Sequence, residues 1–420
     1  MTLTIRRRPR WLATRTRLAA AGVCTTLVVS AGITGSVIGL AHADPGWGSS
    51  SLFADNGTTT PPLTTATPQP ATAGQPAGTV YANRKVEGSR LFAGARDGNQ
   101  FTYWSIGADG NPHLSNGSLY LPGQPAPAGG YPIVAWAHGS RGLADNCAPS
   151  VQPTDTDLDA LRTWLSRGYA VVSTDYAGLG TTGTPQYFDI NATAHNIVDA
   201  VRAGHDISDQ LSRKWAVVGE GQGGSAAIAL AQSAPGLQGA TLDYRGSAAT
   251  SIPAQFASLL TNLGPSTTLT VPSGWVSEAL FTLSAIRTAH PDVGLDGYLT
   301  DTGRSWLTKA ATMCAADLTR AADGLALGSL FSKPLAQNSA LKQILDSAST
   351  PPARGFVRPV LMTQTLQDPS VVVPLTLRYI NDARVADRRV EAHTYLTLDG
   401  SAAKTLADND TRAFLTRVMR

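Results

Sequence analysis

The stretch VVGEGQGGSAAIALA, residues 217–231, runs from a short apolar segment through a glycine-dense turn into a series of small residues. An apolar run that ends at glycines predicts a buried strand, and the alanine-rich run after it predicts a closely packed helix. Strands that pass directly into helices are the units of sheets with helices on both faces. The stretch therefore favours an α/β fold with a sharp turn at Gly221.

The same alternation continues on both sides of this turn. We expect strands at 117–123, 131–139, 169–180 (with its loop), 215–219, 237–244, 357–364 and 390–398, and helices at 156–168, 196–207 and 409–419. The strand signal disappears between about Thr250 and Ser349, where the pattern is helical. A helical block between two strands predicts a cap inserted over the sheet.

The N-terminus has the order of a secretory signal. Residues 1–43 carry six arginines and no acid, then an apolar run from Leu18 to Leu40, then the small-residue sequence AHA ending at Ala43. This order favours cleavage after Ala43, and the alternative is an uncleaved membrane anchor, because the run is about as long as a bilayer span. Residues 44–80 are rich in Thr, Pro, Ser and Ala, which predicts a flexible stalk. We expect a secreted or cell-envelope protein.

Removal of the signal changes the charge of the chain. The full sequence has 33 basic and 30 acidic side chains, and without the six arginines of the signal 27 bases face the same 30 acids. The mature chain is then slightly acidic, with no basic stripe for nucleic acid. We expect no nucleic-acid partner, and membrane contact only through an uncleaved anchor.

Two cysteines remain after Cys24 leaves with the signal, namely Cys147 and Cys314. An oxidising compartment favours their pairing. A bridge between them closes a loop of about 168 residues and stabilises the fold by roughly 5 kcal/mol at most. The alternative is two separate buried thiols.

Five ordered segments resemble the secretory lipases of actinobacteria, a group that includes α/β-hydrolases of the Candida lipase A type. The segments are residues 133–150, 168–183, 217–231, 298–318 and 359–374. The resemblance covers about residues 80–420. It implies an α/β-hydrolase core in residues 81–249 and 351–420, a helical lid in residues 250–350 and ancestral activity on acyl esters. It also supports the pairing of Cys147 with Cys314.

This family carries a serine, an aspartate and a histidine at three motif positions, because ester attack needs a nucleophile, a base and a group that orients the base. The serine of Gly-X-Ser-Gln-Gly-Gly falls on Gly221, and the histidine after the last strand falls on Gly400. The aspartate falls on Asp368 and is retained. Glycine at the turn relieves backbone strain of about 1–3 kcal/mol. Loss of both reacting groups predicts a pseudoenzyme.

Five other side chains are candidates to replace the missing groups. Ser225 lies one helical turn past the apex and is interpreted as a packing residue, and Ser140 as a turn residue of the oxyanion loop. Glu220 precedes the apex, where a desolvated carboxylate can act as base or nucleophile. His138 is interpreted as a loop residue. His393 is seven residues before Gly400, which is too far for it to replace the missing base.

The sequence predicts no metal site and no cofactor. It has no His-Glu-X-X-His and no Cys-X-X-Cys motif. Residues 219–224 fit Gly-X-Gly-X-X-Gly but lack the context of a dinucleotide-binding unit. What remains is a binding site, in which backbone N–H groups of Gln222 and of the Gly139–Ser140 loop polarise a carbonyl.

Three functions are consistent with these features. The first is a lipase-like pseudohydrolase that binds a lipid or acyl-ester ligand. The second is an active carboxylic-ester hydrolase or acyltransferase with a relocated nucleophile, for which Ser140, Ser225 and Glu220 are the candidates. The third is a structural or partner-binding envelope protein that uses the stalk and scaffold.

Overall fold

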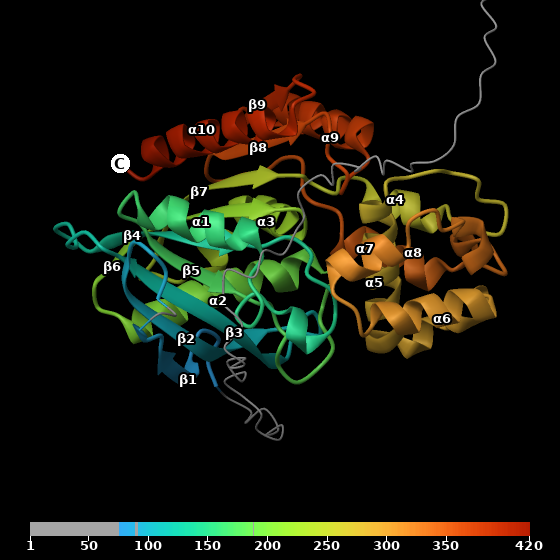
Figure 1. Ribbon diagram of the computed structural model, residues 1–420, viewed down its shortest axis with the longest axis horizontal. Helices are drawn as coiled ribbons and strands as arrows, with labels where there is room; N and C mark the ends of the chain where they lie inside the picture. The colour runs from blue at the N-terminus through green and yellow to red at the C-terminus, as the bar shows by residue number, and fades with distance from the viewer. Residues whose placement is uncertain (1–74, 89–90, 188) are drawn as a thin grey trace, which may run out of the picture. The chain divides into compact units, whose positions relative to one another are not determined.

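A mixed sheet forms the centre of the part of the chain that the computed structural model describes, which is residues 75–420 without 89–90 and 188 (Figure 1). The strands are β1 (Val80–Lys85), β2 (Ala95–Ile106), β3 (Pro112–Pro122), β4 (Tyr131–Ala137), β5 (Ala170–Thr174), β6 (Leu211–Glu220), β7 (Asp243–Thr250), β8 (Val360–Thr365) and β9 (Val390–Tyr395). The predicted signal, residues 1–43, and the predicted stalk up to residue 74 lie outside the described residues.

The helices follow the strands in the order of an α/β protein. They are α1 (Asp155–Leu165), α2 (Ile190–Ile207), α3 (Gln222–Leu237), α4 (Phe256–Thr261), α5 (Ser273–Ala289), α6 (Asp301–Ala310), α7 (Ala315–Ala321), α8 (Ser339–Ala348), α9 (Val373–Ala386) and α10 (Gly400–Val418). In the part of the chain that the structure describes, no helix is long and apolar enough to cross a membrane.

The strand order is β1-β2-β3-β5-β4-β6-β7-β8-β9. The six strands from β5 to β9 in this order are parallel, whereas β1, β2 and β3 pair antiparallel and β3 pairs antiparallel with β5. The expected fold class, a mostly parallel sheet flanked by helices, is therefore confirmed. Parallel strands end at the same edge, so the loops after β4, β6, β8 and β9 meet there.

Successive residues of β6 show how both faces of the sheet are covered. Trp215 and Val217 pack in the cluster that contains α2 and α3, and Ala216 and Val218 pack in the cluster that contains α1 and α10. Side chains alternate between the faces of a strand, so a strand with apolar residues at every position needs helices on both sides. This requirement explains the continuous apolar run that precedes the turn at Gly221.

The helical insertion, residues 251–359 between β7 and β8, has a hydrophobic core of its own. Trp275 and Phe281 of α5 pack there with Leu307 of α6 and Leu345 of α8, and all four are buried. Figure 1 shows α4 to α8 grouped together beyond the end of the strands. Leu143 and Tyr187, from the loops after β4 and β5, belong to the same cluster, so the insertion packs on the loops at that edge.

Several elements have bounds that differ from those expected, among them β7 and α10. The strand predicted at 237–244 is wrong, because α3 extends to Leu237 and β7 begins at Asp243. The Gln238 side chain accepts hydrogen bonds from Trp215 Nε1 at 3.0 Å and from the backbone N–H of Tyr244 at 2.8 Å, which fixes a turn there. The last helix begins at Gly400 rather than 409, because Asp399 caps it by accepting from the N–H groups of Ser401 and Ala402.

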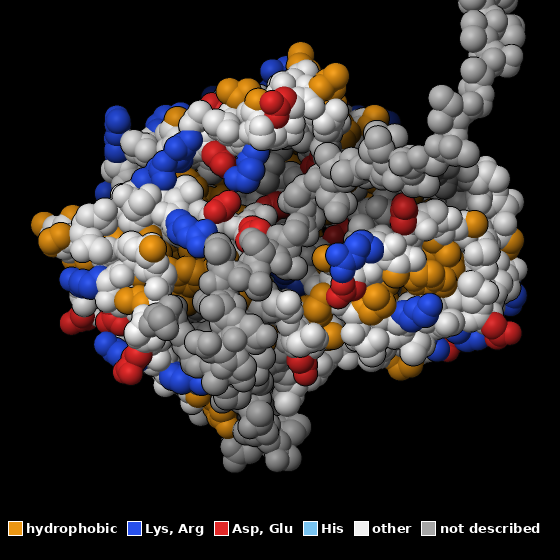
Figure 2. All heavy atoms as spheres, in the orientation of Figure 1, with side chains coloured by type: hydrophobic (Ala, Val, Ile, Leu, Met, Phe, Trp, Pro, Cys, Tyr) orange, Lys and Arg blue, Asp and Glu red, His pale blue; other side chains and the backbone are white. Residues whose placement is uncertain are grey.

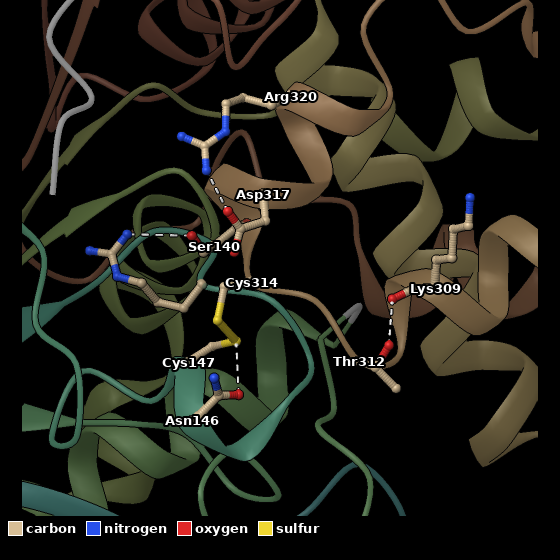
Figure 3. Close-up of a disulfide and its surroundings, with 9 residues drawn as sticks. Ser140, Asn146, Cys147, Lys309, Thr312, Cys314, Asp317 and Arg320 are labelled. Carbon is tan, nitrogen blue, oxygen red and sulfur yellow. Dashed lines mark hydrogen bonds and ion pairs between the residues drawn. A yellow bond between two sulfur atoms is a disulfide. The ribbon is translucent and has the colours of Figure 1, made fainter. Parts of the chain in front are cut away.

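A disulfide joins Cys147, which lies after β4, to Cys314, which precedes α7 (Figure 3). The two Cα atoms are 5.4 Å apart, within the normal range for such a bridge. A backbone hydrogen bond of 2.9 Å from Ala315 N–H to Arg141 O lies beside it. The loop after β4 is therefore tied to the helical insertion by a covalent bond and by backbone pairing.

We predict that the variant Cys147→Ser/Cys314→Ser loses about 3–5 kcal/mol of unfolding free energy, because the open loop gains conformational freedom in the unfolded chain. Urea denaturation of both proteins measures the difference. A reducing agent should destabilise the unchanged protein and leave the double variant unaffected. An unchanged midpoint in the double variant would contradict this role.

Candidate functional site

The turn between β6 and α3 has the backbone shape of a nucleophile elbow. Gly221 adopts φ 54° and ψ −117°, a conformation that residues with a Cβ rarely occupy. Its N–H donates to Thr250 O at 3.1 Å, and its carbonyl accepts from Ser225 N–H at 3.1 Å. The elbow geometry is thus retained, and glycine occupies it without side-chain strain.

The four glycines around this turn differ in the space beside them. A Cβ on Gly223 would lie 2.0 Å from the Ala137 carbonyl oxygen, and one on Gly219 would lie 2.2 Å from the Gly223 carbonyl oxygen. A Cβ on Gly224 would also meet backbone, at 2.8 Å. In contrast, a Cβ on Gly221 meets only the Cα of Gly139, at 3.6 Å, which is an ordinary contact. The site therefore has room for a side chain at 221 and at none of the other three positions.

Two backbone donors face the same end of the sheet. The N–H groups of Gln222, at the start of α3, and of Ser140, after β4, have no hydrogen-bond acceptor among the described residues. The N–H of Gly223 is already used, because it donates to His138 O at 3.1 Å. Free N–H groups at a helix start and an adjacent loop are the usual donors to a polarised carbonyl oxygen.

A buried ion pair holds the loop after β4. Arg141 Nη2 lies 2.6 Å from Asp157 Oδ1 of α1, and Trp136 Nε1 donates to the same carboxylate at 2.9 Å. Burial alone would raise the pKa of Asp157, but the Arg141 charge and these hydrogen bonds lower it to about 2. Asp157 is therefore ionised, and it neutralises Arg141.

His138 is built into the same loop. Its side chain is almost fully buried, its ring stacks on Tyr176 at 4.2 Å, and Nδ1 lies 2.6 Å from Gly139 O. Burial and the nearby Arg141 lower its pKa to about 4, so the imidazole is neutral at pH 7. These contacts favour the interpretation of His138 as a loop residue.

The positions of the expected acid and base lie in the loops after β8 and β9. The Asp368 carboxylate accepts from Gln364 Nε2 at 3.1 Å, from Ser370 N–H at 2.9 Å and from Ser370 Oγ at 2.5 Å. No histidine of the described residues bonds to it. Gly400 is exposed at the first position of α10, and a Cβ there would meet nothing within 4 Å.

His393 is engaged elsewhere, on β9. Its Nδ1 lies 2.6 Å from Asp410 Oδ2 of α10, and its Nε2 lies 3.3 Å from Glu391 Oε1 of its own strand. Tyr395 also donates to Asp410, at 2.7 Å. Both ring nitrogens therefore have acidic partners other than Asp368.

Sequence reasoning missed a polar cluster formed by Ser140, Tyr187 and Glu278. The Tyr187 hydroxyl hydrogen-bonds to Ser140 Oγ and to the Glu278 carboxylate, and Ser140 lies close enough to Glu278 to lower the pKa of Glu278. Burial raises the pKa of Glu278. Glu278 is the one acid of α5, a helix in which most side chains are buried, and this isolated charge was the available sequence signal.

Glu220 and Ser225 flank the apex in different environments. Glu220 has no hydrogen bond or ion pair within the described part of the chain, and burial raises its pKa despite the opposing Arg141 charge. The Oγ of Ser225 is buried without a hydrogen-bond partner among the described residues. Ser225 therefore has no base beside it, whereas Glu220 is a desolvated acid next to the elbow.

Comparison with solved structures defines the class as an α/β-hydrolase fold. The rice cell wall degrading esterase LipA from Xanthomonas oryzae superposes with a TM-score of 0.67 at 19% identity, over 82% of this chain and 100% of the esterase. Candida antarctica lipase A superposes with a TM-score of 0.59 at 18% identity, over 77% of each chain. At these identities the likeness establishes the fold.

A family model matches part of the sequence. The family model described as secretory lipase matches residues 148–348, so the resemblance to this family is confirmed. This match includes α1, the elbow and most of the helical insertion. None of the curated proteins compared with the sequence matches it.

Because the space beside the elbow glycines is unequal, alanine substitutions there should differ in their loss of unfolding free energy. We expect Gly221→Ala to cost about 1–3 kcal/mol of unfolding free energy, which is the strain of a Cβ at positive φ. The matched variant Gly223→Ala should cost more than about 4 kcal/mol or fail to fold, because its Cβ collides with backbone. Urea denaturation of the two variants measures both. Equal losses of unfolding free energy in the two variants would contradict the difference in space beside Gly221 and Gly223.

Proposed function

We propose that this chain is an exported lipase-like protein of the α/β-hydrolase fold that binds a lipid or acyl-ester ligand without Ser-His-Asp chemistry. The observation that carries the proposal is Gly221, which occupies the elbow apex with the backbone conformation retained and no side chain to attack a carbonyl. The secretory lipase family suggests export, which agrees with the signal expected in residues 1–43.

The surroundings of the apex support the absence of a triad. Asp368 accepts hydrogen bonds from Gln364 and Ser370 and orients no imidazole of the described residues. Gly400 has no side chain, and His393 is bonded to Asp410 and Glu391. A serine at 221 would therefore have no imidazole base among the described residues.

The remaining features of the site support the proposal that the chain binds a ligand. The N–H groups of Gln222 and Ser140 are two donors without acceptors in the described residues, and both follow parallel strands, β6 and β4, at the edge where the elbow lies. The helical insertion is tied to this edge by the Cys147–Cys314 disulfide. A site that had lost all function would not need to keep this turn geometry and two unpaired donors together.

We predict that the unchanged protein hydrolyses short-chain p-nitrophenyl esters no faster than a denatured control, and that Gly221→Ser/Gly400→His gains turnover. The new serine and imidazole would supply the two missing groups, and Asp368 is already in place. Ester turnover and fluorophosphonate labelling of residue 221 measure the gain.

The matched control is Gly221→Ala/Gly400→His, which adds the same backbone strain and the same imidazole without a nucleophile. It should remain inactive. Turnover by the unchanged protein would contradict the proposal directly, whatever the variants do.

A second function has one specific observation in its favour. Ser140 Oγ is hydrogen-bonded to the Tyr187 hydroxyl, which is also bonded to Glu278, so a hydroxyl and a carboxylate base are joined through one phenol hydroxyl. In this alternative Ser140 Oγ attacks the ester carbonyl and its proton passes through the Tyr187 hydroxyl to Glu278. The leaving alkoxide then takes that proton, and water hydrolyses the acyl-Ser140 ester.

Labelling separates the two functions. Our first proposal predicts no fluorophosphonate adduct on the unchanged protein. An adduct that peptide mapping places on Ser140, that is lost in Ser140→Ala and kept in Ser225→Ala, would establish the relocated nucleophile instead. Ser225 is the appropriate control because it is a nearby serine without a base.

A further inference from the structure

The two strands at the ends of the sheet are protected to different extents. β1 lies at one end of the strand order and β9 at the other (Figure 1). β1 carries Arg84 and Lys85, and its register with β2 shifts at a bulge. β9 contains no Lys, Arg or Pro, and its pairing with β8 runs without a shift from Val390 to Tyr395. Lysine, proline and bulges keep edge strands from pairing with other chains, so β9 is the less protected edge.

Exposed apolar side chains gather at the same edge. Seven large hydrophobic side chains are exposed in the part of the chain that the structure describes, and four of them flank β9, namely Val385, Leu396, Leu398 and Leu406. Leu396 and Leu398 directly follow the strand and are 75% and 70% exposed. Leu406 is one helical turn before Asp410, which bonds to His393, so it lies on the side of α10 that contacts β9. Such a cluster around an open edge indicates a contact surface.

The backbone of β9 determines how another strand can pair with it. Val360 N–H donates to Arg389 O at 3.0 Å, so the odd-numbered residues of β9 direct their backbone groups toward β8. Successive residues alternate in direction, and Val390, Ala392 and Thr394 therefore direct theirs toward the open edge. The N–H of Val390 already donates to a carbonyl of the preceding turn, at 3.1 Å. The N–H groups available to another strand are those of Ala392 and Thr394.

An antiparallel pair of identical strands with its two-fold axis at Ala392 uses all of these groups. Ala392 then lies opposite Ala392 of the second copy, and Thr394 lies opposite Val390. The positions between them place Glu391 of each copy opposite His393 of the other. A shift of the axis by one residue would place Glu391 opposite Glu391, or His393 opposite His393. Charge complementarity therefore selects the register centred on Ala392.

The side chains of Glu391 and His393 are accessible to a second copy, because each is more than one-third exposed or close to it, at 39% and 35%. Within one copy His393 Nε2 lies 3.3 Å from Glu391, and His393 Nδ1 lies 2.6 Å from Asp410. Glu391 also pairs with Arg417 of α10. The acid–imidazole contact that each strand makes internally is thus repeated between the two strands.

We infer that β9 pairs antiparallel with β9 of a second copy of this chain, so that the protein is a symmetric dimer with one continuous sheet. The segment after β9 of one copy then lies beside the segment before β9 of the other. Leu398 therefore approaches the end of α9, where Val385 is 78% exposed, and both side chains leave water. Leu398 is two residues before Gly400, so the second copy also covers the loop after β9. This inference goes beyond the proposed function and does not depend on ligand binding.

Sedimentation velocity of the unchanged protein over a concentration series tests the inference without any variant. We expect a monomer–dimer equilibrium in which the dimer predominates at about 100 μM. Thr394→Pro should weaken the dimer at least tenfold, because proline removes the N–H that faces the edge and is tolerated on an edge strand. Thr394→Ala is the matched control, since it removes the same side chain and keeps the N–H. It should change the dissociation constant less than twofold.

A second pair of variants tests the apolar contact. Leu398→Asp should weaken the dimer at least tenfold, because it places a charge where an apolar side chain leaves water. Leu269→Asp is the matched control, since Leu269 is an exposed leucine of the helical insertion, 50% exposed and far from β9 in the sequence. It should leave the dimer unchanged. Thermal unfolding checks that each variant is folded.

Single cysteines test the register. Ala392→Cys should form a disulfide between copies in oxidised glutathione, because the two Cα atoms at such a position are about 5.5 Å apart. Thr394→Cys is the control, since its two copies are displaced by about 13 Å along the strands and should remain unbridged. Peptide mapping identifies the residues that are joined.

The outcomes distinguish a second copy from other occupants of this edge. A monomer at about 100 μM would overturn the inference, as would a dimer that Thr394→Pro or Leu398→Asp leaves intact. Bridging of Thr394→Cys without bridging of Ala392→Cys would overturn the pairing about Ala392. Flotation with phosphatidylcholine vesicles examines a lipid surface as the occupant. Vesicle binding by a monomer, lost in Leu398→Asp, would assign the exposed leucines to lipid and overturn dimerisation.

Discussion

Backbone packed directly on backbone at the elbow is the constraint on which the candidate site depends. A Cβ on Gly223 would collide with the carbonyl oxygen of Ala137. A Cβ on Gly219 would collide with the carbonyl oxygen of Gly223. These contacts press β6, α3 and the loop after β4 together, and they bring Gly139 beside the apex. The positions of the N–H donors follow from that packing and not from any catalytic side chain.

The sequence was sufficient for the core of the fold because its signals there are strong. A continuous apolar run into the glycines at 219–224 specifies a parallel strand and a following helix, and both are present. The strands β1 and β2 were missed. β1 is an edge strand with alternating half-buried and exposed residues, and β2 buries polar groups such as Asn99 and Thr102, so neither has an apolar run. Polar residues that hydrogen-bond inside a sheet are invisible to a hydrophobic pattern.

Sequence reasoning could identify residues of the candidate site only where their motif lies within one continuous segment. Gly221, Gln222 and Asp368 could be named because the motifs around them are local. Glu278 could not, because it is more than fifty residues from the elbow in the chain and reaches Ser140 only through the packing of α5. The distribution of surface charge gives no comparable signal. On the face in Figure 2, Lys and Arg side chains are interspersed with Asp and Glu.

The bridge between Cys147 and Cys314 has a mechanical consequence for access to the elbow. The strand-like pairing of Gly142 with Cys314 and the bond from Ala315 N–H to Arg141 O lie beside it, so three links join the loop after β4 to the start of α7. A hinge motion that lifted α7 would drag Ser140 and its N–H away from Gln222. Entry and exit of a guest molecule must then use other segments of the insertion, so that the two donors keep their spacing throughout.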